Sequence, residues 1–336
     1  MTESTWRVLP LDGTMLWQML RHWREDLDGS ERERLAATLA GVVNGYAPPS
    51  PAPSSSALDA VVGGLTEEGY CSFGNLLRRD QVDAIVAHFR SRPCFNAHVQ
   101  GSSDGVPRHV GEGAEAFHYG SYALKDIVEA PALIELANDP NLLAVAERYL
   151  GCTPTLYSLN AWWSFPGHAK PARVSQSFHR DLDDFRFCTL FVYLTDVDEH
   201  NGPHVYVRRT HRPDLLEQEL ARAGSQALES LEPTIRDAVA SGRILRGQGY
   251  GIDPAILGPL RHLIDVIPGP AGSGLLADTY GFHMGIPPAK APRLIFWARY
   301  GLHANETSPP VDEALVASRI PWTERARYIN RALVTR

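Results

Sequence analysis

The feature that most constrains this chain is the stretch from Ser175 to Arg212, SQSFHRDLDDFRFCTLFVYLTDVDEHNGPHVYVRRTHR. It begins with a short lead-in to His179-Arg180-Asp181. In extended chain, successive side chains point to opposite faces, so His179 and Asp181 share one face and Arg180 takes the other. An imidazole nitrogen and a carboxylate oxygen on one face provide two ligands for a divalent metal. The apolar run from Arg186 to Val197 predicts a strand that is buried on both faces of a sheet.

A second block, residues 269–301, supplies what the first one lacks. It reads GPAGSGLLADTYGFHMGIPPAKAPRLIFWARYG. After the Gly-rich turn we expect a strand from Leu275 to Phe282, which delivers His283 as a third metal ligand. Arg293 opens another apolar strand, Leu294 to Tyr300, one strand away from His283. Its planar guanidinium can hold a carboxylate with two parallel hydrogen bonds.

Together the two blocks resemble the phytanoyl-CoA dioxygenase family of Fe(II)/2-oxoglutarate oxygenases. The shared pieces are an H-x-D, an apolar strand, an Asn-Gly-Pro turn that leads to a G-S-H-R-like end, and a distal His and Arg about ten residues apart. In this chain they are FHRD at 178–181, LFVYLTDV at 190–197, NGP at 201–203, RTHR at 209–212, His283 and Arg293.

The resemblance covers roughly residues 57–305, and it implies a fold and a site. The fold is mainly β with flanking helices around a double-stranded β-helix (jelly-roll, cupin-like) core. Fe(II) would be held by His179, Asp181 and His283, as catalytic and metal-binding residues. The keto-acid end of 2-oxoglutarate would chelate the iron, Arg293 would bind its distal carboxylate, and O₂ would take the remaining position.

Two further residues become candidates through the resemblance, and two positions depart from it. Polar groups on the first core strand of relatives often help to hold 2-oxoglutarate, which makes Asn160 a candidate. Ser177 shares the face of His179 and is another. The departures are RRTHR at 208–212, where a P-G-S-H-R type turn is more common, and His204, where an apolar residue is common. The halogenating variants of the family lack the carboxylate that Asp181 provides, so halogenation is disfavoured.

The chain divides into an extension, a linker and one large domain. Residues 1–46 read as an N-terminal helical extension, and its second helix, over 31–44, follows a Ser-x-x-Glu capping box. Residues 47–56 form a Pro/Ser-rich linker. Residues 57–336 hold the oxygenase domain. A helical insertion at about 213–260 interrupts this domain near the end of the barrel where the metal is expected. We expect the insertion to close over substrate as a lid.

Within the large domain the hydrophobic spacing predicts several elements. We expect helices over Leu58–Glu68, Asp80–Phe89 and 131–150, the last interrupted by an Asp-Pro pair. Strands are expected over Gly69–Phe73 and Thr153–Phe165.

Two groups of residues near the H-x-D resemble extra metal ligands. We interpret Asp183 and Asp184 as a polar turn. His200, His204 and His211 surround the Asn-Gly-Pro turn. We assign none of these histidines to a metal, because the resemblance makes His211 part of a structural turn.

Composition excludes several kinds of partner. The formal net charge is −7 and the chain has no long Lys/Arg run, which argues against nucleic acid. No apolar run reaches the roughly 18 residues of a membrane span, and the N-terminus lacks the pattern of a signal peptide. The 4 cysteines are far apart in sequence, as is typical of reduced thiols in a cytoplasmic protein.

The expected activity is that of an Fe(II)/2-oxoglutarate-dependent dioxygenase. It would hydroxylate, or otherwise oxidise, an unactivated C–H bond of a small molecule and release succinate and CO₂. Three alternatives stay open from sequence: a cupin-like metalloenzyme that does not use 2-oxoglutarate, a non-catalytic jelly-roll binding protein, and a different metal in the same site. Arg293 discriminates the first alternative, because only a 2-oxoglutarate enzyme depends on it for the co-substrate.

Overall fold

The structure is a computed structural model, and it describes residues 29–48, 55–97, 106–168, 175–222, 257–303 and 309–335. Most of the predicted linker and the middle of the predicted insertion, 223–256, lie outside the described residues. The start of the N-terminal extension, 1–28, lies outside them as well.

A seven-stranded antiparallel sheet forms the larger layer of the fold. Its strand order is β1-β8-β5-β10-β4-β3-β2. The strands are β1 (Tyr70–Asn75), β2 (Phe95–Asn96), β3 (Tyr119–Ser121), β4 (Thr155–Ser164), β5 (Phe187–Tyr193), β8 (Ser273–Ala277) and β10 (Arg293–Gly301). The central strand β10 pairs with both β4 and β5. All seven residues of β5 are buried, as the apolar run predicts.

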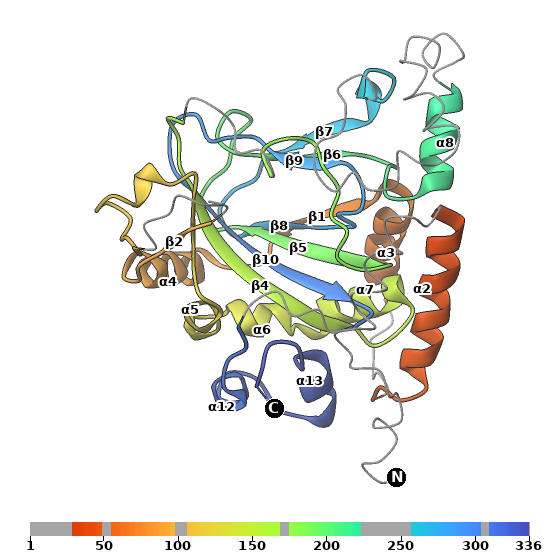
Figure 1. Ribbon diagram of the computed structural model, residues 1–336, viewed down its shortest axis with the longest axis horizontal. Coiled ribbons are helices and arrows are strands. Elements are labelled where there is room, and N and C mark those ends of the chain that lie inside the picture. Colours follow the sequence, from red (N-terminus) through yellow and green to blue (C-terminus); the bar gives the residue numbers. More distant parts are fainter. Residues whose placement is uncertain are drawn as a thin grey trace.

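A smaller sheet faces the larger one. It contains β7 (Ile264–Ile267), β6 (His204–Val207) and β9 (His283–Gly285) in that order. Figure 1 shows it above the seven-stranded sheet. The two inner faces share one hydrophobic cluster, in which Phe191 and Trp297 of the larger sheet join Tyr206 and Ile267 of the smaller. The predicted fold class, mainly β with flanking helices, is confirmed.

Helices cover the outer face of the larger sheet, below it in Figure 1. The described helices are α2 (Gly29–Asn44), α3 (Ser56–Glu68), α4 (Arg79–Arg90), α5 (Leu124–Glu129), α6 (Leu133–Ala137), α7 (Pro140–Leu150), α8 (Pro213–Arg222), α12 (Glu313–Ala317) and α13 (Glu324–Ile329). Helix α7 follows the predicted break, because the carboxylate of Asp139 caps its first amides and Gly151 ends it at φ 79°. No described helix combines the length and the hydropathy that crossing a bilayer requires.

Helix α2 packs against the core. Ala36, Ala40 and Val43 are buried in the cluster between the helices and the larger sheet. At its N-terminal end, the guanidinium of Arg32 lies 3.5 Å from the ring centre of Tyr280.

The predicted strand Leu275–Phe282 is wrong in its second half. Strand β8 ends at Ala277, and His283 begins β9 in the other sheet. The reason is Asp278, whose carboxylate accepts a hydrogen bond from Tyr280 N at 2.9 Å and whose carbonyl accepts one from Gly281 N at 3.0 Å. This turn carries the chain from one sheet to the other.

Candidate metal centre

Backbone hydrogen bonds bring the H-x-D and the distal histidine together. His179 N donates to His283 O at 3.0 Å, and His283 N donates to His179 O at 2.9 Å. Asp181 N donates to Thr279 O at 2.7 Å. The segment around His179 is therefore extended and pairs antiparallel with β9. One ligand atom from each of His179, Asp181 and His283 lies within 4.8 Å of the others.

Both imidazoles are held by the ring nitrogen that faces away from the site. His179 Nδ1 lies 2.8 Å from Ser177 O, and His283 Nδ1 lies 2.9 Å from Gly281 O. A carbonyl only accepts, so Nδ1 carries the proton in each neutral ring and Nε2 keeps its lone pair. The two Nε2 atoms lie 3.8 Å and 3.9 Å from the carboxylate oxygens of Asp181. Outer partners of this kind fix the tautomer of metal-binding histidines.

The ionisation states of the group also suit a metal. Burial lowers the pKa of His283 to about 3, which keeps this imidazole neutral. Burial opposes ionisation of Asp181, but the positive charge of Arg299, followed by the electrostatic influence of His283 and His179, outweighs it and lowers the pKa of this carboxyl to about 2. The site therefore presents one carboxylate and a neutral His283.

Arg299 is a site residue that sequence reasoning missed. Its Nη2 lies 3.1 Å from Asp181 Oδ2, and its Nη1 lies 2.6 Å from Asp183 Oδ2. Tyr157 Oη donates to the same Asp183 oxygen at 3.0 Å. The guanidinium thus holds the Asp181 carboxylate through Oδ2, the oxygen that also lies nearest His283. Arg299 follows Arg293 by six residues on β10, and even spacing puts both side chains on one face of a strand.

The Asn-Gly-Pro turn positions Arg293. Asn201 Oδ1 accepts from Lys290 N at 3.2 Å and Ala291 N at 3.1 Å, which ties the turn to the start of β10. Gly202 has φ +84°, and a Cβ there would lie 2.9 Å from Arg293 Cδ, so only glycine fits. The carbonyl of Gly202 accepts a hydrogen bond from Arg293 Nη1.

Arg293 is buried and is the first residue of β10. Its side chain reaches Ser164, whose Oγ accepts a hydrogen bond from Nη2 at 3.2 Å. The Nε of Arg293 has no hydrogen-bond partner among the described residues, and neither has His204 Nε2 or Trp297 Nε1. All three side chains lie between the two sheets. Buried polar nitrogens without partners are rare in native proteins, so this space is suited to a polar ligand.

His204 lies beside the candidate ligand His283 and near enough to Arg293 to feel its charge. Its ring is nearly parallel to that of His283, with the ring centres 5.7 Å apart, and it packs on Phe191 at 4.3 Å. Burial is the main cause that lowers the pKa of His204 well below its usual value, and the nearby His283 and Arg293 side chains lower it further. Sequence reasoning grouped this residue with His200 and His211. In the structure His200 is exposed, whereas His211 Nε2 lies 3.0 Å from Thr66 O on α3.

The two remaining candidates from the sequence lie in different settings. Asn160 is half-buried on β4, opposite Trp297 of β10, and its Nδ2 donates to Ser158 Oγ at 2.7 Å. Ser177 meets the metal-ligand group through its carbonyl, which orients His179.

Asp183 and Asp184 are not in the group of candidate metal ligands, as interpreted from the sequence, but they do more than form a polar turn. Asp184 is 2% exposed. Its Oδ2 accepts from Leu302 N at 2.7 Å, and its Oδ1 accepts from Phe185 N at 2.6 Å. Asp184 joins the end of β10 to the segment before β5, and Asp183 holds Arg299. Both carboxylates are therefore structural partners.

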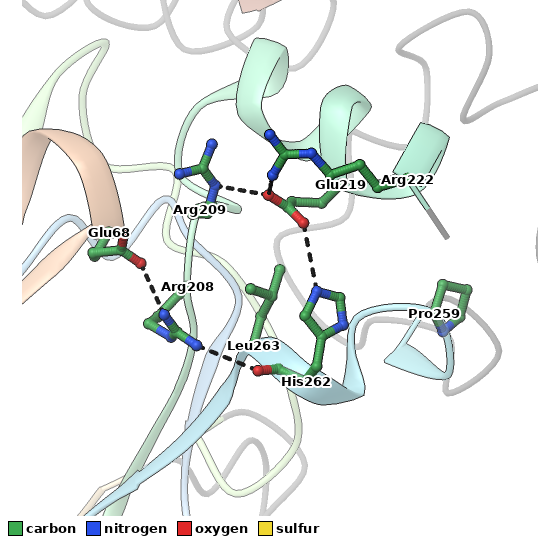
Figure 2. Close-up of a pocket in the computed structure, with 8 residues that line it drawn as sticks. All are labelled: Glu68, Arg208, Arg209, Glu219, Arg222, Pro259, His262 and Leu263. Atoms are coloured by element: carbon green, nitrogen blue, oxygen red, sulfur yellow. Dashed lines mark hydrogen bonds and ion pairs between the residues drawn. The ribbon is translucent and has the colours of Figure 1, made fainter. Parts of the chain in front are cut away.

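A separate hollow of about 710 Å³ lies on the surface where α3, α8 and the turn after β6 meet. Figure 2 shows the carboxylate of Glu219 among the lining residues, with Arg209 and Arg222 at one of its oxygens and His262 at the other. The distances are 2.9 Å to Arg209 Nε, 2.7 Å to Arg222 Nη1 and 3.5 Å to His262 Nε2. None of the three candidate metal ligands lines it, so the hollow and the metal centre are different places.

Two buried imidazoles and one half-buried carboxylate converge between two antiparallel sheets. This donor set fits the 2-His-1-carboxylate arrangement of non-haem iron oxygenases. The fold and this donor set define the class of the protein as an oxygenase of that type. Residues 65–240, more than half of the 336-residue chain, match the family described as Phytanoyl-CoA dioxygenase (PhyH). The chain belongs to this family, and it is an Fe(II)/2-oxoglutarate-dependent oxygenase that uses O₂.

No curated protein matches the chain. Similar solved structures include the epimerase SnoN with Fe³⁺, α-ketoglutarate and nogalamycin RO, at 19% identity over 76% of this chain and 87% of that one, with a TM-score of 0.47. EctD from S. alaskensis with 2-oxoglutarate and 5-hydroxyectoine is 14% identical over 88% and 89%, with a TM-score of 0.47. HygX from Streptomyces hygroscopicus with nickel and 2-oxoglutarate is 14% identical over 77% and 91%, with a TM-score of 0.44. At these values the likeness is too distant to indicate a substrate.

Proposed function

We propose that this protein oxidises an unactivated C–H bond of a small molecule, with hydroxylation as the outcome, at a metal held by His179, Asp181 and His283. The observation that carries the proposal is the convergence of two Nε2 lone pairs and one carboxylate within 4.8 Å in a buried site. Iron and 2-oxoglutarate, when bound, supply the oxidant, with release of succinate and CO₂. The remaining roles belong to residues of this chain.

Arg293 binds the distal carboxylate of 2-oxoglutarate in this proposal. The Asn-Gly-Pro turn holds the guanidinium in place through the carbonyl of Gly202. The Nε of Arg293 has no hydrogen-bond partner among the described residues. A rigid guanidinium offers two parallel donors to a carboxylate, which an ammonium group does not. We retain Asn160 as a second contact for the co-substrate, because it lies on the inner face of the larger sheet opposite Trp297.

Arg299 and Ser177 act on the ligands rather than on the co-substrate. Arg299 holds the Asp181 carboxylate at 3.1 Å, and the carbonyl of Ser177 holds the His179 ring. Both contacts orient a donor atom toward the position that the metal takes. Loss of such outer partners costs about 10- to 100-fold in metal affinity or activity.

Anaerobic titration of Fe(II) and 2-oxoglutarate into the metal-free protein tests the proposal. We expect the weak visible charge-transfer band of the chelated complex, and we expect Asp181→Ala to abolish it. Arg293→Lys keeps the charge and loses the paired donors, so 2-oxoglutarate should bind roughly 10- to 100-fold more weakly, as expected for the loss of a hydrogen bond to a charged group.

Iron binding without the band would contradict the co-substrate assignment and favour a cupin-like metalloenzyme. If the band forms, the substrate can be sought by measuring succinate release in the presence of candidate small molecules. A compound that raises succinate formation well above the uncoupled level, and that gains one oxygen atom, would identify substrate and reaction together.

A further inference from the structure

His204 is the residue that the proposed roles leave unexplained. It stands directly after the Asn-Gly-Pro turn, where the family commonly has an apolar residue. Its side chain is buried and its Nε2 has no hydrogen-bond partner among the described residues. An unpaired polar nitrogen in this position destabilises the protein, whereas an apolar residue in its place carries no such penalty. A ligand that pairs with the nitrogen accounts for its presence.

The backbone of His204 is fixed by contacts on two sides. Its N–H donates to Tyr193 Oη at 2.9 Å, and the same hydroxyl donates to Ile267 O at 2.7 Å. On the other side His204 is opposite Gly285 in the pairing of β6 with β9. The ring is then clamped between Phe191 and His283. The side chain is therefore held in one place, as a binding group requires.

Arg293 lies immediately beyond this pair of strands. A Cβ on Gly285 would lie 3.5 Å from both terminal nitrogens of Arg293. The chain is also continuous here, because Gly202, whose carbonyl accepts from Arg293, precedes His204 by two residues. His204 thus stacks beside a candidate metal ligand, and Gly285, its partner on the neighbouring strand, lies close to the guanidinium of Arg293. A molecule that spans from the metal to Arg293 passes His204.

We infer that the Nε2–H of His204 donates a hydrogen bond to the distal carboxylate of 2-oxoglutarate, beside Arg293. This inference rests on the proposed function, in which Arg293 binds the same group. Two of the guanidinium nitrogens already donate to Gly202 and Ser164. A carboxylate has about four acceptor positions, so it accommodates a second donor from the opposite sheet. His204 therefore contributes to selecting a dicarboxylic over a monocarboxylic 2-oxo acid.

The test compares two ligands and two variants under anaerobic conditions with Fe(II) at saturation. The ligands are 2-oxoglutarate and 2-oxopentanoate, which has the same keto-acid end and no distal carboxylate. His204→Leu removes the donor, and His204→Gln restores an N–H group. Dissociation constants come from the visible band or from calorimetry, and the Fe(II) affinity of each variant is measured separately.

We expect His204→Leu to bind 2-oxoglutarate roughly 10- to 100-fold more weakly while its affinities for 2-oxopentanoate and Fe(II) stay within about twofold. His204→Gln should recover part of the loss, for 2-oxoglutarate alone. Unchanged 2-oxoglutarate binding in both variants would overturn the inference, since His204 would then pair with water only. An equal loss for both ligands would overturn it too, because His204 would then act at the metal end. If wild-type protein shows no 2-oxoglutarate complex, the proposed function fails, and that result is distinct from either outcome.

Discussion

Arg209 allows a quantitative test of how the turn after β6 is stabilised. Its φ is +66°, in the left-handed region that favours glycine. In the more common P-G-S-H-R type turn, glycine takes this position. A side chain in that conformation costs about 1 kcal/mol or more. The compensation visible in the structure is the contact with Glu219, whose side chain is 4% exposed and 2.9 Å from Arg209 Nε.

Two replacements of Arg209 separate the contribution of the ion pair from the cost of the positive φ. Breaking a fully buried ion pair costs about 3–5 kcal/mol and an exposed one contributes at most about 1 kcal/mol. The Glu219 carboxylate keeps Arg222 and His262 as partners, so we expect Arg209→Ala to lower the free energy of unfolding by about 2 kcal/mol. Arg209→Gly loses the same ion pair and regains about 1 kcal/mol at positive φ, so its net loss is about 1 kcal/mol.

Urea denaturation followed by tryptophan fluorescence measures both values. The expected order of stability is wild type, then Arg209→Gly, then Arg209→Ala. In the Glu219→Gln background the gap between wild-type Arg209 and alanine should shrink, since the ion pair is already weakened. Equal stability of Arg209→Ala and wild type would refute the ion-pair argument. If the glycine variant is no more stable than the alanine variant, the backbone argument is wrong.

Four further predictions concern the metal centre and the core. A divalent metal at 100 times its Kd should raise the free energy of unfolding by about 2.7 kcal/mol in thermal melts, and Asp181→Ala should abolish the gain. Arg299→Gln should raise the pKa of the Asp181 carboxyl in metal-free protein, measured by ¹³C NMR, because Arg299 is the strongest of the influences that lower it. The pKa of His283 is about 3 when folded and is near 6.5 when unfolded, so the unfolded chain binds the extra proton between these values. Metal-free stability should therefore be complete above pH 6.5 and fall toward pH 3, less steeply in His283→Gln. Asp184→Ala leaves two buried backbone N–H groups unpaired and should cost about 2–4 kcal/mol in denaturant melts; a loss below 0.5 kcal/mol would contradict that account.

The metal-ligand group was predictable because it depends on local patterns. Alternation along an extended chain puts His179 and Asp181 on one face, and their carboxylate and imidazole atoms do lie together. Helix α7 was predictable for the same reason, since its cap at Asp139 and its end at Gly151 are signals within a few residues. The second imidazole, His283, was expected at the end of a strand, and the resemblance supported it, although that strand ends at Ala277.

The parts that sequence reasoning missed depend on contacts between distant segments. The bend after Ala277 is made by Asp278, which looks like an ordinary polar residue until its buried hydrogen bonds are seen. Asp184 is similar, because its partner amide at Leu302 is more than a hundred residues away. Arg299 is different, since the two-residue period from Arg293 already placed it on the inner face.

The pairing of His179 with His283 also sets the earliest time at which the proposed metal site can be complete. The two residues belong to segments about a hundred positions apart, and their backbone groups hydrogen-bond directly to each other. At about 5–20 residues per second of synthesis, the second imidazole leaves the ribosome roughly 5–20 s after the first. A nascent chain that has exposed only the H-x-D holds two of the three donors. A complete set of donors therefore requires that the second block has been synthesised and that the two sheets have met.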